Sequence, residues 1–292
     1  LKIVAGPVEQ TFYFKEGLYD WLLNYELTLP NGSKFKPFDP EIPFRIVDWA
    51  ISMKYLKERP PRDYILTTWG VGWWKYAPDV AEQLLKSVGF KRGPDGKWRL
   101  PDGSLWKIEI YTTTYEIDVY RTAFPVADQW RRFGIEVNVE PVAPGPFDSR
   151  NIKGEWDVIT YFPSCNFLPV DLGDILPRWH SKYCNPELPG LAWLSYSNWA
   201  CYNFPRRAEL DKILEELEKV HPEDPRQIEL SRKALLIWLE QMPWPQFFPV
   251  PFYTLNNRYC WEGFPEYPAN YYNDPVYWWP HFQLILLQLR PT

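Results

Sequence analysis

Aromatic and amide side chains are the residues of this sequence whose types and spacing point to chemistry, and they gather in two segments. The longer is the loop "RWHSKYCNPELPGLAWLSYSNWACYNFP", residues 178–205, and the shorter is "WGVGWWKY", residues 69–76. The candidate binding residues in these segments are Trp69, Trp73, Trp179, Trp193, Asn198, Trp199, Tyr202 and Asn203. An aromatic ring offers a large flat surface, and an amide both donates and accepts hydrogen bonds. Together they suit a ligand with apolar faces and a hydroxyl rim, such as a neutral sugar.

Each of these rings could instead pack a core, and the sequence leaves both uses open. The rings of the loop 178–205 could bind a ligand or could hold the loop against the rest of the fold. In the shorter segment, Gly70 and Gly72 permit a hinge-like backbone. Trp69 and Trp73 could therefore line a cleft or pack beside a hinge.

The composition favours a sugar over a nucleic acid as the partner of these rings. The chain has 17 Trp, 19 Tyr and 17 Phe among 292 residues, and such rings can also stack on bases. A nucleic-acid binder usually shows a basic stripe, whereas this chain has a formal net charge of −5 and no such stripe. We therefore expect no nucleic-acid partner.

The ionisable residues form no recognisable catalytic or metal-binding pattern. The three histidines, His180, His221 and His281, are scattered, and the four cysteines include no C-x-x-C pair. The sequence also lacks H-E-x-x-H, G-x-S-x-G and a phosphate-binding loop. We expect no enzymatic activity, metal or cofactor. Carboxylates are plentiful, however, so an aromatic-lined glycoside hydrolase remains an alternative.

From residue 77 onward, the sequence predicts the helices and strands of an α/β fold, and these elements must position the candidate residues. Alternating or apolar runs predict strands at 106–113, 135–140 and 156–161, and a helix at 118–134 joins the first two in a βαβ unit. Further helices are predicted at 77–88, 206–220 and 223–242, the last with Asp224 as its N-cap. No stretch approaches the roughly 20 apolar residues that a membrane span needs.

Helical periodicity predicts which residues of these helices face inward. The expected inward residues are Val80, Ala81, Leu84, Leu85 and Val88; Ala123, Phe124, Ala127, Trp130 and Phe133; and Leu210, Ile213, Leu214, Leu217 and Val220. Pro125 should kink its helix or mark its first turn. Residues 1–65 give no clear pattern: 29–44 is predicted to be a proline-rich loop, with Asn31-Gly32-Ser33 a tight turn rather than a glycosylation site.

The series "DVAEQLLKSVGF", "DGKWRLPDGSLWKIEIYTT", "RTAFPVADQWRRFGIEVNVE", "WDVITYF", "FPRRAELDKILEELEKV" and "EDPRQIELSRKALLIWLEQM" resembles the C-terminal lobe of the family 5 extracellular solute-binding proteins. The resemblance covers residues 77–292. It implies a mixed-sheet α/β lobe of a periplasmic-binding-protein-like (Venus flytrap) fold. Residues 1–76 match poorly and are expected to be a lead-in segment near the interlobe crossing. The N-terminal lobe of the family is expected to be absent.

The same resemblance implies a function. Its members are receptors that capture a solute between two lobes and deliver it to the membrane subunits of an ABC importer. They are extracytoplasmic, they are not enzymes, and we expect a monomer. The peptide-binding members carry an acidic residue after the "WDV" strand, where this chain aligns Asn166. A neutral amide suits hydroxyls better than an ammonium group. The expected ligand is therefore a β-linked gluco- or manno-oligosaccharide, with an oligopeptide as the alternative.

The resemblance also bears on the cysteines. Cys184 and Cys201 match the ends of a bridged loop in the dipeptide-binding members, which implies a disulfide suited to an extracytoplasmic protein. Cys165 and Cys260 are expected to be buried thiols or a second pair. The 31 prolines against 15 glycines, with two methionines, suggest a heat-tolerant protein.

Overall fold

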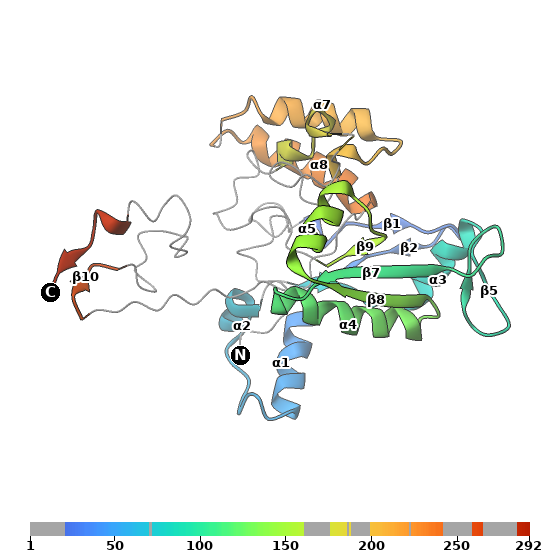
Figure 1. Ribbon diagram of the computed structural model, residues 1–292, viewed down its shortest axis with the longest axis horizontal. Coiled ribbons are helices and arrows are strands. Elements are labelled where there is room, and N and C mark those ends of the chain that lie inside the picture. Colours follow the sequence, from blue (N-terminus) through green and yellow to red (C-terminus); the bar gives the residue numbers. More distant parts are fainter. Residues whose placement is uncertain are drawn as a thin grey trace.

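The computed structural model describes residues 21–69, 72–160, 176–185, 187, 199–221, 223–241, 259–264 and 285–292 (Figure 1). Its central feature is a three-stranded parallel sheet in the order β8-β7-β9. The strands are β7 (Lys107–Thr113), β8 (Glu136–Val142) and β9 (Val158–Ile159). This confirms the predicted α/β class and all three predicted strands.

Helices cover both faces of this sheet, because consecutive residues of a strand point to opposite sides. Ile110 of β7 packs with Ala123 and Ala127 of α4 (Ile117–Arg132). The next residue, Tyr111, stacks on Phe147 of α5 (Pro144–Lys153), with 5.1 Å between ring centroids. Figure 1 shows α4 and α5 on either side of the strands. The expected βαβ unit is thus β7-α4-β8, and α5 leads back across to β9.

The antiparallel strand pairs of the described residues form separate two-stranded sheets. These pairs are β1 (Leu27–Thr28) with β2 (Lys34–Phe35), β3 (Phe38–Asp39) with β4 (Trp73–Trp74), β5 (Lys91–Arg92) with β6 (Trp98–Arg99), and β10 (Trp261–Glu262) with β11 (Arg290–Pro291). The three described strands of the central sheet all run parallel, so its expected mixed character does not come from them.

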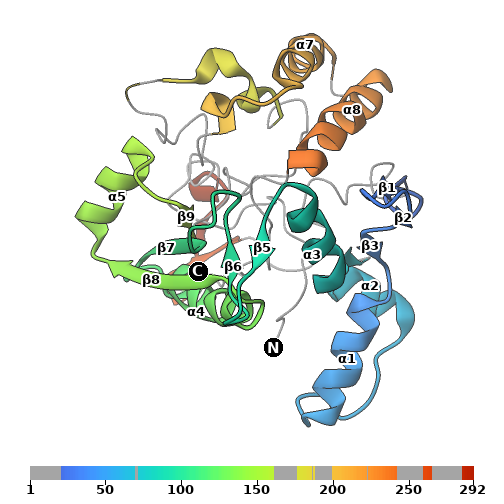
Figure 2. The ribbon, with the colours of Figure 1, turned by 90° about the vertical axis from the view of Figure 1, so that its right-hand side faces the viewer.

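The N-terminal region has more structure than the sequence predicted. Asn31-Gly32-Ser33 forms the expected tight turn, in which Gly32 has φ +83° and Ser33 N donates to Asn31 Oδ1 at 3.0 Å. The predicted loop at 29–44 is wrong, because the turn joins β1 to β2 and Ile42 begins α1 (Ile42–Ser52). A proline in the first turn is compatible with a helix, since its missing N–H is not needed there. Helix α1 and its partner α2 (Arg62–Trp69) project from the body of the molecule (Figure 2).

Two expected helix faces are only partly correct. Helix α4 continues through Pro125, and its buried stripe is Val119, Ala123 and Ala127. Phe124 was expected inside but is 39% exposed, because it lies about 100° around the helix from Ala123. Helix α3 (Pro78–Ser87) ends as predicted before Gly89 but buries no residue, and Leu84 and Val88 are exposed. Leu85 is its contact with the core of the sheet.

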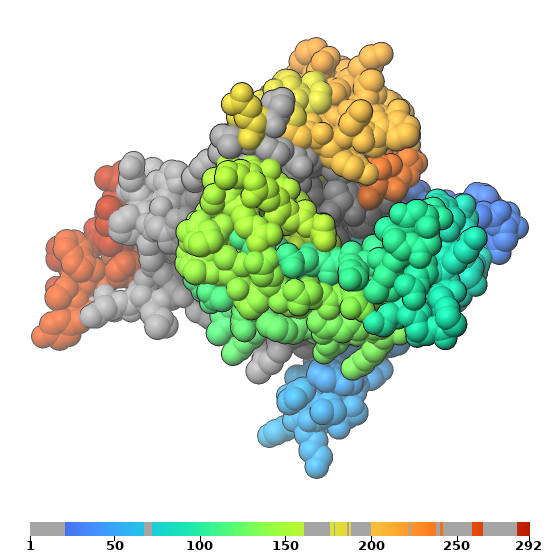
Figure 3. Space-filling model, turned by 45° about the vertical axis from the view of Figure 1, so that its right-hand side comes forward, coloured from blue at the N-terminus to red at the C-terminus, as the bar shows by residue number. Residues whose placement is uncertain are grey.

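A second core lies between α7 (Arg207–Leu217) and α8 (Arg226–Gln241). Leu210, Leu214 and Leu217 are buried as predicted, and Asp224 Oδ1 accepts a hydrogen bond from Arg226 N at 2.9 Å as a capping residue should. This core also contains Leu22 and Phe38, so the lead-in segment packs against the C-terminal helices. Figure 3 shows α7 and α8 above the sheet and α5, with α1 projecting below.

Candidate functional site

The carboxyl edge of the central sheet is the first candidate site. In an open α/β sheet, ligands bind beyond the carboxyl ends of the strands, where connections leave in opposite directions. Here that point lies between β7 and β9, because β7 connects to β8 on one side and has β9 on the other. Asn166 follows β9, but it lies outside the described residues.

Three buried threonines stand at this edge, and none was singled out in the sequence. Thr160 Oγ1 donates to Thr112 Oγ1 at 2.7 Å. Thr113 Oγ1 is buried and has no hydrogen-bond partner within the described part of the chain. Hydroxyls both donate and accept, so the edge offers neutral polar groups rather than charges. The signal that could have revealed them is the run Thr112-Thr113-Thr114 at the end of a predicted strand.

The second candidate site is a surface beside a disulfide bond. Cys184 and Cys201 are bonded with an S–S distance of 2.01 Å, as the resemblance implied. The bond joins the short helix η4 (Ser181–Tyr183) to η5 (Trp199–Cys201). The next residue, Tyr202, is 50% exposed and stacks on Phe204 with 5.7 Å between centroids. Asn203 is exposed between them. We refer to Tyr202 and Asn203, together with the buried Phe204 ring on which Tyr202 stacks, as the Tyr202 surface.

A buried arginine connects the segments around the Tyr202 surface. The Arg207 guanidinium donates to the carbonyl oxygen of Ala200 at 3.1 Å and to that of Trp179. Its Nε lies 3.3 Å from Asp211 Oδ1, and its charge lies over the Phe204 ring at 5.6 Å. Burial lowers the pKa of Arg207, and the neighbouring Asp211 carboxylate opposes that shift. The arginine thus ties η3 (Leu176–Trp179), η5 and α7 together.

The structure separates the predicted binding residues by their exposure. Trp179 is 2% exposed and lies in the core beside α7, and Trp73 is half-buried against the same core. Their placement is the core-packing alternative that the sequence left open. Tyr202 and Asn203 are the predicted residues that reach the surface. Outside the described residues or side chains lie Asn166, Trp193, Asn198 and the rings of Trp69 and Trp199.

The remaining cysteines follow the expectation only in part. Cys260 is a free thiol, but it is exposed rather than buried, and it lies directly before β10. Cys165 lies outside the described residues.

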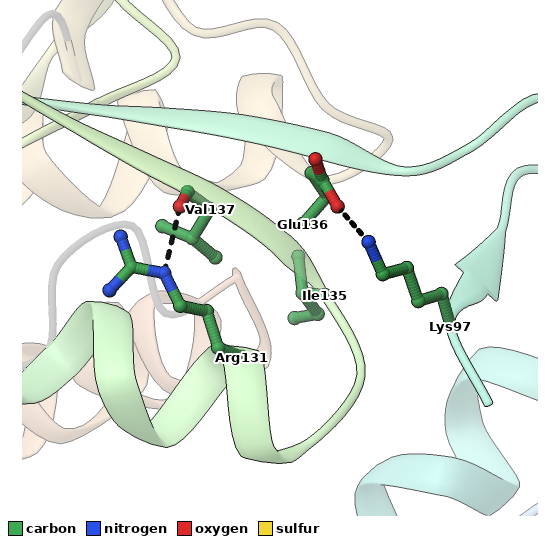
Figure 4. A pocket seen from close by; sticks show the side chains of 5 residues that line it. All are labelled: Lys97, Arg131, Ile135, Glu136 and Val137. Atoms are coloured by element: carbon green, nitrogen blue, oxygen red, sulfur yellow. Dashed lines mark hydrogen bonds and ion pairs between the residues drawn. The ribbon is translucent and has the colours of Figure 1, made fainter. Parts of the chain in front are cut away.

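A shallow hollow of about 310 Å³ lies at the amino end of β8 (Figure 4). It is lined by Lys97, Arg131, Ile135, Glu136 and Val137. Lys97 forms an ion pair with Glu136, and Arg131 Nε donates to the Val137 carbonyl at 2.9 Å. The charged groups of this hollow are therefore engaged with one another or with the backbone. It lies at the end of the sheet opposite the three threonines.

Two features are absent from the described residues. None of their helices is long and apolar enough to cross a membrane. Nor do the described ranges bring three His, Cys, Asp or Glu side chains together as metal ligands.

Comparisons with known proteins relate part of the chain to one family. Residues 48–168 match the profile of "Bacterial extracellular solute-binding proteins, family 5 Middle". The match begins within α1, ahead of the boundary expected at residue 77. A search of curated proteins finds no match.

Several solved structures are similar to this chain at low sequence identity. A mannohexaose-bound periplasmic oligopeptide-binding protein from Thermotoga maritima is 19% identical, with a TM-score of 0.56 over 76% of this chain and 40% of that one. A second structure of this Thermotoga maritima protein is 21% identical, with a TM-score of 0.52 over 82% of this chain and 42% of that one. NikZ from Campylobacter jejuni, in complex with Ni(L-His), is 20% identical, with a TM-score of 0.46 over 59% of this chain and 31% of that one.

The chain spans about 40% of the length of the Thermotoga maritima protein. At these identities the likeness shows a shared fold. The family match and the shared architecture agree with each other and with the order of elements found here. Residues 48–168 therefore match family 5 of the bacterial extracellular solute-binding proteins, and the α/β architecture of the chain agrees with a single lobe of a periplasmic-binding-protein fold.

Proposed function

We propose that this chain is the ligand-binding part of a receptor that delivers a neutral oligosaccharide, of the β-linked gluco or manno class, to an ABC importer. The observation that carries the proposal is the Tyr202 surface. Tyr202 leaves half of its area open to solvent, although it is stacked and held beside a disulfide. A ring kept rigid and exposed in this way is suited to contact with a flat ligand.

The polar groups around this ring support a neutral ligand. Asn203 can donate to one hydroxyl and accept from another. The nearest charged side chain in sequence, Arg206, forms ion pairs with Glu209 and Glu240 at 2.6 Å each. The surface therefore presents no uncompensated charge from that residue.

The comparisons support the receptor class more strongly than the ligand. The Thermotoga maritima protein was solved with mannohexaose bound, which agrees with the sugar proposal but is said of that protein. A peptide ligand is the competing proposal, and it would require an anion to pair with the peptide ammonium. Under either ligand we propose an extracytoplasmic, non-enzymatic protein whose partners are the importer's membrane subunits.

A thermal-shift screen of the purified protein separates these ligands. The panel contains cello-, manno-, laminari- and xylo-oligosaccharides, and di- to pentapeptides. A ligand that binds only the folded state raises the melting temperature. At a concentration of a hundred times its Kd, it adds about 2.7 kcal/mol to the free energy of unfolding. We expect at least one oligosaccharide to do so, without being hydrolysed. Stabilisation by peptides alone, or turnover of the bound sugar, would contradict the proposal.

A further inference from the structure

We propose that His180 is a proton-operated switch that controls the Tyr202 surface, holding it in place when neutral and releasing it when protonated. The inference rests on the proposed function for its ligand readout, while its structural readout is independent of any ligand. It starts from a buried histidine that the binding proposal does not use. His180 is 7% exposed and lies between Trp179 of the core and the first residue of η4.

The hydrogen bonds of His180 fix its neutral form. Its Nδ1 accepts from Lys182 N at 2.9 Å, and this bond caps the start of η4. Since Nδ1 is the acceptor, the proton of the neutral ring lies on Nε2. That nitrogen is 3.3 Å from Glu215 Oε1, to which it donates.

Protonation removes the acceptor on which η4 depends. With a proton on Nδ1, two donors would face each other, the imidazolium N–H and Lys182 N–H. Asp211 Oδ1 is another acceptor, 3.7 Å from Nδ1. Asp211 already accepts from Ser181 N at 3.0 Å and from Ser181 Oγ at 2.5 Å. The ring can therefore gain Asp211 only by moving toward it, and Lys182 N–H then loses its partner.

Charged side chains surround the buried His180 ring. From α7 it faces Asp211 and Glu215, with Glu218 further along and the guanidinium of Arg207 beyond Asp211. From η4 it faces the backbone of Lys182, whose ammonium is held by Glu218 at 2.6 Å. Histidine is the side chain whose charge ordinarily changes between pH 5 and 8.

A covalent path links this change to the ligand surface. Helix η4 ends at Tyr183, and the next residue is Cys184. Cys184 is bonded to Cys201, which is followed directly by Tyr202. A shift of η4 on loss of its cap is therefore passed through the disulfide to the Tyr202 ring. We expect acid to weaken ligand binding.

The test compares the wild type with His180→Asn between pH 8 and pH 5. Asparagine is a good capping residue and cannot be protonated, so it mimics the neutral histidine. The matched control is His221→Asn. His221 Nδ1 likewise accepts from the amide two residues on, Glu223 N at 3.3 Å, but at an exposed position with no link to the disulfide.

We expect the Lys182 amide and Tyr202 ring NMR signals of the unliganded wild type to move with the same midpoint as the His180 ring. Oligosaccharide affinity should fall by at least about fivefold from pH 8 to pH 5, the lower end of coupling between linked sites. His180→Asn should abolish both responses, and His221→Asn should keep them.

Two results would overturn the switch. One is a Lys182 amide signal that does not move while the His180 ring titrates in the wild type. This measurement needs no variant and no ligand. The other is a pH response that persists in His180→Asn. Failure of every oligosaccharide to bind would instead contradict the proposed function, with the NMR titration still deciding the switch.

Discussion

At the scale of single residues, the Tyr202 surface depends on one buried cation. Arg207 donates to carbonyl groups from η3 and η5, which are far apart in sequence, and it pairs with Asp211 on its own helix. Removing one partner from a buried ion pair leaves the other charged group without compensation, which makes such changes strongly destabilising.

Arg207→Met should therefore lower the free energy of unfolding by about 3 kcal/mol or more. The neighbouring Arg206 provides the control, since its side chain is about one-third exposed and its ion pairs lie at the surface. Arg206→Met should lower the same quantity by about 1 kcal/mol or less. Urea unfolding of both variants measures the difference. Equal losses would show that Arg207 is not the support described here.

Predictions for single residues from the sequence were correct where they rested on a local sequence pattern or on the resemblance to the family. The Cys184–Cys201 bond followed from the resemblance, and it is present. Which rings are exposed could not be predicted, because Trp179 and Tyr202 sit in one loop with the same composition. Burial depends on α7 and on Phe38, which are distant in sequence. The three threonines were missed because their proximity requires the pairing of β7 with β9.

At the scale of elements, the turn between α4 and β8 depends on a glycine. Gly134 has φ +92°, and a Cβ there would lie 2.6 Å from the Gly96 carbonyl oxygen. Gly134→Ala should destabilise the protein by about 1–3 kcal/mol, because it adds both backbone strain and a clash. Gly145 of α5 has open space around its Cα and is the control.

Gly145→Ala should leave stability unchanged or raise it by up to about 1 kcal/mol, since it reduces the freedom of the unfolded chain. Thermal unfolding of the two alanine variants tests this contrast. If Gly134→Ala melts at the wild-type temperature, the turn is not constrained as described.

An ion pair holds α5 against the sheet and should give a dependence on pH. A hydrogen bond from Arg150 lowers the pKa of Glu140, and burial opposes this only partly. A carboxylate with a lowered folded pKa adds stability above its unfolded pKa, near 4.5, and this stability is lost as the pH falls through the folded value.

Glu140→Gln should remove that contribution, so the stability gap between wild type and variant should narrow as the pH falls from about 5 to 3. Urea unfolding at several pH values measures the gap. In an Arg150→Gln background, Glu140→Gln should show no such narrowing. A gap that is the same at pH 7 and pH 3 would contradict the role of the pair.

Element types were predictable where the hydrophobic period was clear, as in β7, β8, α7 and α8. The N-terminal elements were not, because α1 starts at a proline-rich segment and its short strands pair with distant partners such as β4. The face of α3 was misjudged for another reason. Periodicity shows which residues share a face, but it does not show whether another element covers that face.

At the scale of the whole molecule, two cores carry the two candidate sites. One core lies under the parallel sheet and supports its threonine edge. The other lies between α7 and α8 and supports the Tyr202 surface. The family match covers the sheet, and the aromatic surface lies outside the matched residues 48–168. The receptor class thus rests on the first core, and the proposed ligand rests on the second.

The central claim is that the half-exposed ring of Tyr202 contacts a neutral oligosaccharide, and titration calorimetry with the best ligand of the screen tests it most directly. Tyr202→Ala should weaken binding by about 5- to 150-fold, equivalent to 1–3 kcal/mol. Tyr202→Phe should keep most of the affinity because it keeps the ring. Tyr76→Ala should have no effect, because Tyr76 is exposed elsewhere. Unchanged affinity in Tyr202→Ala, with the Tyr76→Ala control intact, would contradict the account.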